Sequence, residues 1–249
     1  MNPEICVFPD LEALSRAALE RILAWAREAV DTRDRFTVAL SGGKTPRRLY
    51  ELWNERDDFP WRHTYFFLGD ERFVLPTHPE SNQGILFTLW KKRLLRGDTH
   101  LVAPETRDVS LETAAMLYEE VLWNFFGGFP RFDLILLGLG EDCHTASLFP
   151  GHPALQEVQR LVVPVVNAPK PPARRLTFTL PVLNQGRHLL YLIAGSHKAE
   201  PVYRSFEERD PACPASRIRP RRGTLSLFLD QEAAARLSHP GPCNLPATD

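Results

Sequence analysis

The sequence predicts an α/β fold in which helices cover both faces of a mainly parallel sheet. Short apolar runs of strand length alternate along the chain with longer segments whose apolar residues recur at helical spacing. One run, Leu134–Leu137, is too apolar to face water on either side, which is typical of a buried parallel strand. Alternation of this kind indicates βαβ units rather than hairpins, and therefore a parallel sheet.

The first half of the chain supplies three strands and four helices. A helix is expected from residue 10 to about 31, with Asp10 as its N-cap, and Pro46 suits the first turn of the next. Ser81 and Ser110 begin two more, at 81–95 and 110–126, the latter closed by Gly127. The strands, each a short apolar run, are expected at 36–40, 64–68 and 101–103.

The second half continues the alternation. Apolar strands are expected at 134–137, 161–166, 189–194 and 225–229, and the alternating residues 176–180 predict one more after Pro171-Pro172. Helices are expected from about Lys198 to 209 and over 230–237. We therefore expect a single domain over residues 1–237, followed by a loose tail at 238–249 that is rich in proline and polar residues.

Composition excludes several classes of function. The net charge of −1 argues against a broad nucleic-acid or membrane surface, and no apolar run approaches the ~20 residues that span a bilayer. The four cysteines, Cys6, Cys143, Cys213 and Cys243, show no CxxC spacing and predict neither a zinc site nor a disulfide framework. We expect a cytoplasmic protein without metal or cofactor that is a monomer or a small homo-oligomer.

Four polar loops follow strands and are expected to meet at one edge of the sheet, where ligands of open α/β sheets bind. Ser41-Gly42-Gly43-Lys44-Thr45 lies between a strand and a helix, where free N–H groups and the helix dipole suit a phosphate. It is not a Walker A loop, because Val38 stands where that motif requires glycine. An ordinary tight turn is the alternative.

The other three loops carry charge. Asp70 and Arg72 follow the second strand, and they suit sugar hydroxyls and an anion, although a solvated loop is the alternative. Arg175 and Lys198 are further cations, for which surface charge is the ordinary explanation. Lys198 begins a helix, where its charge opposes the dipole unless an anion lies nearby.

His144 is the candidate catalytic base. It follows the apolar strand 134–137 and the break at Gly138 and Gly140, in a polar loop with Glu141 and Asp142. A structural histidine at a helix start is the competing interpretation, and position alone favours neither. The remaining seven histidines lack a comparable setting.

In order along the chain, these motifs resemble the 6-phosphogluconolactonases of the pentose phosphate pathway. The resemblance rests above all on residues 138–151, Gly-Leu-Gly-Glu-Asp-Cys-His-Thr-Ala-Ser-Leu-Phe-Pro-Gly. The shorter matches are Ser-Gly-Gly-Lys-Thr-Pro at 41–46, Gly-Asp-Glu-Arg-Phe-Val at 69–74, Glu-Ser-Asn at 80–82, Arg-Arg-Leu-Thr at 174–177, Gly-Ser-His-Lys at 195–198, Pro-Ala-Ser-Arg-Ile at 214–218 and Leu-Asp-Gln-Glu-Ala-Ala at 229–234.

The resemblance implies a Rossmann-like three-layer α/β/α sandwich that is shared with glucosamine-6-phosphate deaminases. It implies hydrolysis of 6-phospho-D-glucono-1,5-lactone, with His144 as general base and Asp142 or Glu141 as its orienting group. Either Arg72 or N–H groups of the loops would stabilise the oxyanion. The glycine loop with Lys44, Arg175 and Lys198 would then hold the phosphate. Arg72 and the Thr-Ala-Ser-Leu-Phe run at 145–149 favour the lactonase branch.

Two positions depart from the family pattern, which commonly has Ser or Thr at Lys44 and Gly at Cys143. If residue 143 is left-handed, its Cβ costs about 1–2 kcal/mol. A nucleophilic Cys143 is a further alternative, although neighbouring residues such as Cys143 and His144 seldom achieve the required geometry. The rival functions are glucosamine-6-phosphate deamination and non-catalytic binding of a sugar phosphate.

Overall fold

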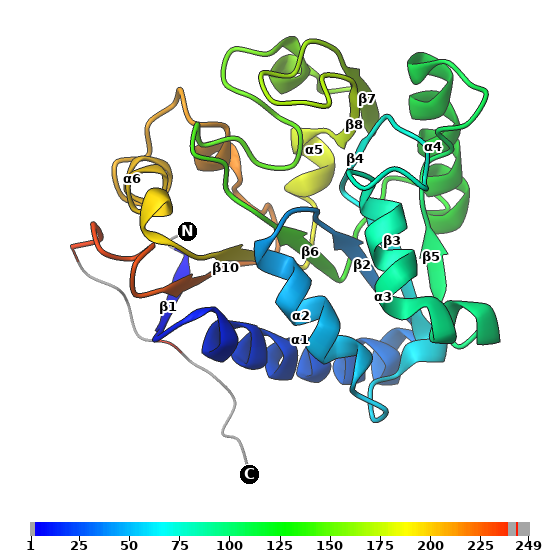
Figure 1. Cartoon of the computed structure of the whole chain (residues 1–249), viewed down its shortest axis with the longest axis horizontal. Coiled ribbons are helices and arrows are strands. Elements are labelled where there is room, and N and C mark those ends of the chain that lie inside the picture. Colours follow the sequence, from blue (N-terminus) through cyan, green and yellow to red (C-terminus); the bar gives the residue numbers. More distant parts are fainter. Residues whose placement is uncertain (1–2, 239–242, 244–249) are drawn as a thin grey trace.

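The computed structural model describes residues 3–238 and 243, and its central feature is a seven-stranded parallel sheet. The strands run in the order β1-β10-β9-β6-β2-β3-β5, with every neighbouring pair parallel (Figure 1). Their bounds are β1 Glu4–Phe8, β2 Phe36–Leu40, β3 Thr64–Leu68, β5 His100–Val102, β6 Leu134–Leu137, β9 His188–Ile193 and β10 Thr224–Asp230. The predicted α/β fold with a mainly parallel sheet is confirmed.

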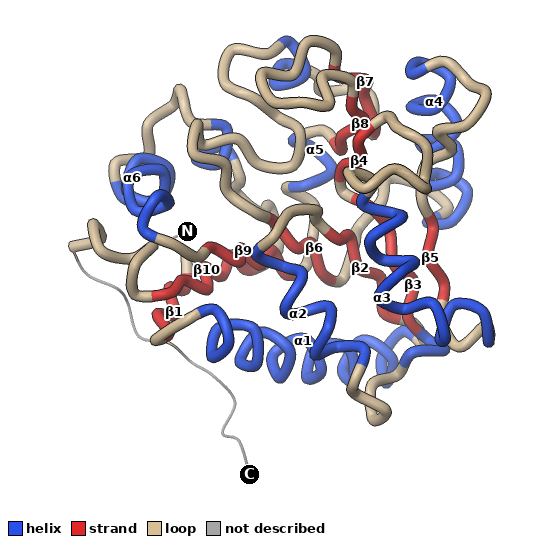
Figure 2. The backbone as a smooth tube through the Cα atoms, in the orientation of Figure 1, coloured by secondary structure: helices blue, strands red, loops and turns tan. Residues whose placement is uncertain are grey.

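Helices form a layer on each face of this sheet. On one face lie α1 (Leu11–Arg33), α2 (Thr45–Asn54) and α3 (Asn82–Arg96), and on the other lie α4 (Leu111–Phe126) and the short α5 (Leu180–Leu183) (Figure 2). Successive residues of β2 and β3 enter opposite cores, since Val38 and Phe66 pack with α1–α3 while Ala39 and Phe67 pack with α4. The sheet is therefore dry on both faces, as its apolar strands predicted.

A second, antiparallel sheet of three strands lies on the α4 side and was not expected. Its order is β4-β8-β7, with β4 at Asp70–Arg72, β7 at Val162–Val165 and β8 at Arg175–Phe178. The sequence predicts a loop at 70–72, because three charged residues in a row do not show the pattern of a strand. Pairing with β8 places Arg72 directly opposite Arg175.

The predicted helix starts are confirmed by side-chain caps. Asp10 Oδ1 accepts from Ala13 N at 2.8 Å, Ser81 Oγ from Gly84 N at 3.1 Å and Ser110 Oγ from Thr113 N at 3.0 Å. Each cap satisfies an N–H group that the first helical turn leaves without a partner. Local chemistry alone fixes these ends, which is why the sequence located them.

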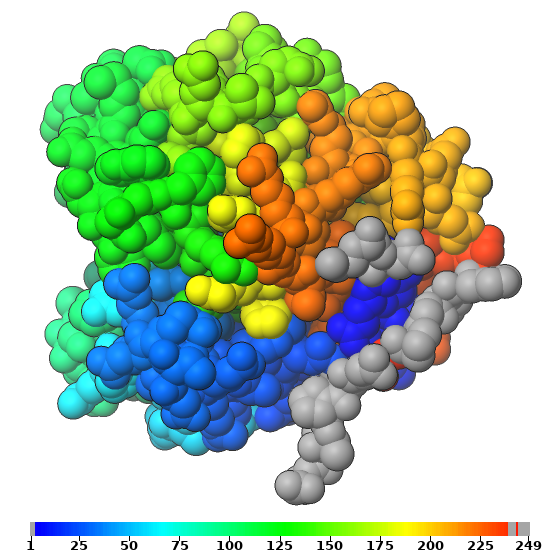
Figure 3. All heavy atoms as spheres, turned by 180° about the vertical axis from the view of Figure 1, so that it is seen from behind, coloured from blue at the N-terminus to red at the C-terminus, as the bar shows by residue number. Residues whose placement is uncertain are grey.

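The C-terminal third differs from the prediction in two helices and one pairing. Residues 231–236 form turns and not a helix, because Asp230 Oδ1 accepts from Ala233 N at 2.7 Å and closes the chain locally. The segment after Lys198 is broken into α6 (Ala199–Val202) and a π-helical turn at Tyr203–Glu207. The unpredicted β1 lies beside β10, so the N-terminal residues contact the C-terminal third (Figure 3).

A disulfide joins Cys6 of β1 to Cys243, so the expectation of no disulfide was wrong. These cysteines are 237 residues apart, and sequence spacing does not reveal such a pairing. The expected loose tail at 238–249 falls outside the described residues except for Ser238 and Cys243. Among the described helices, none is long and apolar enough to cross a membrane.

Asp133, at the entrance to β6, joins three parallel strands through one buried carboxylate. Its Oδ2 accepts from the Thr37 amide at 2.9 Å and the Thr37 hydroxyl at 2.8 Å, which belong to β2. Its Oδ1 lies 3.0 Å from Arg33 at the end of α1 and 3.3 Å from Arg187, just before β9. The side chain is only 6% exposed, so these partners replace water.

We predict that Asp133→Ala lowers the free energy of unfolding by about 3 kcal/mol, because it leaves a buried N–H group and two arginines without their acceptor. Urea unfolding followed by circular dichroism measures this loss. Arg62→Ala is the control, since Arg62 forms an exposed ion pair with Asp98 and should leave the unfolding midpoint unchanged. Equal effects of the two substitutions would contradict the assignment.

Candidate active site

The carboxyl ends of the parallel strands open into a cavity of ≈ 370 Å³. It lies where the strand order reverses beside β2, so the loops after β2, β6 and β9 reach it together. Every predicted site residue except Asp142 lines this cavity. Those residues are Ser41, Gly42, Gly43, Lys44, Thr45, Asp70, Arg72, Glu141, His144, Arg175 and Lys198.

His144 projects from the loop after β6, and Asp142 holds its imidazole. Asp142 Oδ1 hydrogen-bonds to His144 Nδ1 and also accepts from the His144 amide at 3.3 Å. The ring packs on Phe149 at a centroid distance of 4.6 Å. A Cβ at Gly140 would collide with both His144 and Asp142, so only glycine leaves room for this pair.

Of the two neighbouring carboxylates, it is Asp142 that contacts the His144 imidazole. Burial acts to raise the pKa of Asp142, but the hydrogen bond and charge of His144 outweigh it and lower the pKa to about 2. The carboxylate is therefore charged throughout the neutral range and accepts an Nδ1 proton. This tautomer leaves Nε2 of His144 with a lone pair, and no described residue hydrogen-bonds to it.

The glycine loop forms another wall of the cavity, before the N-terminus of α2. Gly43 has a φ of 104°, a backbone conformation that side chains rarely adopt. A Cβ at Gly42 would collide with the Asn82 side chain, so glycine lets α3 approach the loop. Lys44 is exposed at the N-cap of α2, whose dipole adds positive character there.

Arg175 and Lys198 bring two cations that are partly withdrawn from water. Arg175 is 4% exposed, and its guanidinium donates to the carbonyls of Lys170 and Pro172 at 3.0 Å. Burial lowers the pKa of Arg175, and burial also lowers the pKa of Lys198, against which the charge of Glu141 acts. Cations that are desolvated in a shared cavity bind an anion more strongly than exposed ones do.

Asp70 and Arg72 enter the cavity from β4. Asp70 Oδ2 accepts from Ser147 Oγ at 2.7 Å, so this buried carboxylate fastens the His144 loop to the small sheet. Arg72 donates from Nη1 to the Glu80 carbonyl at 2.8 Å, while its buried Nε has no partner among the described residues. The structure thus gives Asp70 a structural contact that the sequence did not predict.

The cavity residues that the prediction did not include are Pro46, Gly138, Leu139, Gly140, Ala146, Lys170, Leu192, Ile193 and His197. Lys170 lies before Pro171-Pro172, and its carbonyl holds Arg175. Its position next to Pro171-Pro172 and shortly before Arg174 and Arg175 was the sequence feature that could have identified Lys170 as a third cation of the site. Nothing in the sequence distinguished His197 from a surface histidine.

The chain matches known proteins in both sequence and fold. Residues 9–227 match the family model described as glucosamine-6-phosphate isomerases/6-phosphogluconolactonase. A 6-phosphogluconolactonase of Synechocystis sp. is 40% identical over 243 residues, which cover 95% of this chain and 99% of the relative. That of Nostoc sp. is 39% identical over 244 residues, covering 96% and 100%.

The chain belongs to the 6-phosphogluconolactonase family of lactone hydrolases. Its fold agrees with solved members of the family. The 6-phosphogluconolactonase of Leishmania guyanensis superposes with a TM-score of 0.85 at 29% identity, covering 96% of this chain and 100% of that one. That of Trypanosoma brucei gives 0.83 at 27% identity, with 95% and 99% covered.

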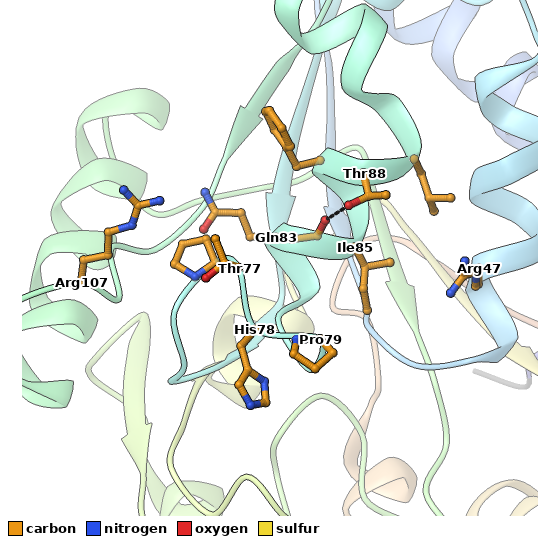
Figure 4. Close-up of a pocket in the computed structure, with 12 residues that line it drawn as sticks. Arg47, Thr77, His78, Pro79, Gln83, Ile85, Thr88 and Arg107 are labelled. Carbon is orange, nitrogen blue, oxygen red and sulfur yellow. Dashed lines mark hydrogen bonds between the residues drawn. The ribbon is translucent and has the colours of Figure 1, made fainter.

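A larger cavity of ≈ 550 Å³ lies on the outer side of α3, away from His144. Figure 4 shows Thr77, His78 and Pro79 along one edge, with Gln83 and Ile85 of α3 above them. Its lining is mainly apolar, and among the described residues it contains no carboxylate. Of these two cavities, only the smaller one therefore combines a histidine with carboxylates.

Cys143, beside the candidate base, has the left-handed backbone that the sequence analysis considered, with a φ of 65°. Its side chain is fully buried, and its Sγ lies 3.9 Å from the Pro201 carbonyl. Burial raises the pKa of Cys213 to about 12. Cys143 does not line the cavity, so the geometry gives no support to a nucleophilic role.

We predict that Cys143→Gly changes the free energy of unfolding by no more than about 1 kcal/mol, because relief of the left-handed backbone offsets the lost sulfur contacts. Cys213→Gly is the matched control, since Cys213 has an ordinary φ of −84° and gains no such relief. Thermal unfolding of both variants compares them. A greater loss for Cys143→Gly than for Cys213→Gly would contradict the strain at Cys143.

Proposed function

We propose that this enzyme hydrolyses 6-phospho-D-glucono-1,5-lactone to 6-phospho-D-gluconate with His144 as general base and without a metal ion. The observation that carries the proposal is the arrangement of the cavity. An imidazole oriented by a charged carboxylate shares it with a glycine loop, a helix N-terminus and two desolvated cations. A substrate that carries a phosphate and an electrophilic carbonyl suits this cavity, because the glycine loop and the cations can hold the phosphate while the imidazole acts at the carbonyl.

His144 would act twice in one turnover. Nε2 takes a proton from water as the water oxygen attacks the lactone carbonyl, and Asp142 stabilises the imidazolium that forms. When the tetrahedral intermediate collapses, the bond from the carbonyl carbon to the ring oxygen breaks. The imidazolium then returns its proton to that oxygen, which becomes a hydroxyl group, so base and acid are the same residue.

The oxyanion of the intermediate is assigned to Arg72. Its guanidinium is largely buried at the cavity wall, and its position opposite Arg175 adds positive potential. A donor fixed before the reaction stabilises developing charge without reorganisation. The Gly42–Gly43 loop, Lys44, Arg175 and Lys198 are assigned to the phosphate, with Glu141 beside Lys198.

The location and assembly expected for this chain stay predictions. A relative from Arabidopsis thaliana, 36% identical over 219 residues, carries the description chloroplastic in its name. The cytoplasmic location expected for this chain stays a prediction, and the Cys6–Cys243 disulfide, a bond more typical of oxidising compartments, speaks against it. The expected monomer or small homo-oligomer also stays a prediction.

We predict that His144→Ala lowers kcat by about 10²–10⁴ because the general base is lost. Proton release from freshly prepared lactone, corrected for spontaneous hydrolysis, measures this. His152→Ala is the control, since His152 accepts from Ala154 N at 3.1 Å near the same loop but does not line the cavity. Unchanged turnover by His144→Ala would exclude the proposed base.

Lys198→Ala should raise KM by about tenfold or more while kcat changes little, because a phosphate contact contributes equally to ground and transition states. The control is Lys91→Ala on the exposed side of α3. Steady-state kinetics over a range of lactone concentrations separate the two constants. A fall in kcat with KM unchanged would instead place Lys198 at the reacting carbonyl.

A further inference from the structure

Glu71 is a fully buried acid for which the proposed reaction has no use. It lies between Asp70 and Arg72 in β4, is 1% exposed and does not line the catalytic cavity. Its Oε1 accepts from Arg72 N at 2.7 Å and Asn82 N at 2.8 Å. Its Oε2 accepts from Gln83 N at 2.7 Å and Ser81 Oγ at 3.3 Å. Both oxygens therefore have hydrogen-bond partners, and three of the four donors belong to residues 81–83 at the start of α3.

The segment that Glu71 binds is the one that holds Arg72. The Glu80 carbonyl accepts from Arg72 Nη1 at 2.8 Å, and the Glu80 carboxylate lies 3.6 Å from the same nitrogen. Asn82 Nδ2 donates to the Asp70 carbonyl at 2.9 Å, and its side chain packs against Gly42 of the glycine loop. Residues 80–82 therefore contact two elements of the catalytic cavity, β4 and the glycine loop.

A carboxylate suits this position better than any neutral group. The amides of Asn82 and Gln83 belong to the first turn of α3, where N–H groups lack helical partners and the dipole favours negative charge. The outer side of the turn is also constrained, since a Cβ at Gly84 would collide with the Pro76 carbonyl. Figure 4 shows that outer side, where Gln83 and Pro79 line the larger cavity.

We propose that Glu71 is a positioning residue of this active site, whose carboxylate fixes residues 80–82 and through them the Arg72 guanidinium. The inference rests on the proposed lactone hydrolysis and on the role of Arg72 in it. Glu71 touches neither substrate nor reacting atoms, so it acts entirely through Arg72. The geometry supports this role, because the segment at the start of α3 that Glu71 binds also holds the Arg72 guanidinium.

The charge of Glu71 should make this positioning depend on pH. Burial raises the pKa of Glu71 to about 7, while the amides of Gln83, Asn82 and Arg72 act to lower it. Asp70 on the same strand adds to the rise, and Tyr118 of α4 also lies within reach of its charge. When Glu71 is protonated, one of its oxygens carries a hydrogen. That oxygen then faces the amide N–H groups as a donor and no longer accepts from them. Positioning is therefore complete above pH ~7 and is lost as the pH falls below it.

The test is a double-mutant cycle on the full chain with Glu71→Gln and Arg72→Ala. At pH 8, Glu71→Gln should lower kcat by about tenfold to hundredfold with KM nearly unchanged, because a misplaced cation no longer meets the oxyanion. In the Arg72→Ala background the same substitution should change kcat by less than about twofold. An equal fall in both backgrounds would overturn the proposal.

The pH profile gives a readout that a merely structural role would not move. Wild-type kcat should fall as the pH drops below about 7, and the fall should be shallower in Glu71→Gln, which carries no carboxylate at this position. Ser110→Ala is the control, since it removes an equivalent helix cap from α4 and should leave kcat and its pH profile unchanged. A Glu71→Gln profile as steep as that of wild type would also overturn the proposal.

Ser81→Ala covers the case in which Glu71→Gln does not fold, because it removes only one of the four hydrogen bonds to Glu71. It should lower kcat less than Glu71→Gln, and again only when Arg72 is present. Failure of this inference can be distinguished from failure of the proposed function. Absence of lactone hydrolysis by wild type rejects the function, whereas an active Arg72→Ala variant with unchanged kcat rejects Arg72 and Glu71 together.

Discussion

The active site depends on one buried hydrogen bond, from Ser147 Oγ to Asp70 Oδ2 at 2.7 Å. Ser147 belongs to the loop after β6 that carries His144, and Asp70 belongs to β4 of the small sheet, next to Arg72. The Ser147 amide also donates to Thr177 Oγ1 of β8 at 3.1 Å, two residues from Arg175. The candidate base His144 follows β6 of the parallel sheet, whereas Arg72 and Arg175 belong to the antiparallel sheet. Since Ser147 and Asp70 are both buried, loss of either partner would leave a polar group without water.

The loop that carries His144 satisfies its own backbone. Gly140 N donates to the His144 carbonyl at 2.8 Å, Cys143 N to the Gly140 carbonyl at 3.0 Å, and Ala215 N to the Cys143 carbonyl at 3.2 Å. Such a network over-determines the conformation and tolerates left-handed angles at residues other than glycine. The backbone cost at Cys143 is therefore offset by these hydrogen bonds.

Those parts of the molecule that local chemistry determines could be predicted from the sequence. Asp10, Ser81 and Ser110 were recognisable as caps because such side chains accept from amides a few residues ahead. In the structure, each accepts from the amide three residues ahead. The parallel sheet followed from the apolar runs, and the convergence of the loops on one edge followed from the sheet. The family resemblance then linked His144 and the glycine loop to a reaction. It did not distinguish Asp142 from Glu141, a choice that required the orientation of two side chains.

What the sequence did not reveal depends on pairing across long separations. The short β4 has no recognisable strand pattern and exists because β8 lies opposite, about a hundred residues later. The bond between Cys6 and Cys243 is of the same kind. Glu71 is the clearest case, because a charged residue between two others resembles a solvated loop. Only the approach of α3 turns it into a buried acceptor with four donors. Its significance follows from tertiary structure, since the helix that satisfies this carboxylate also holds Arg72.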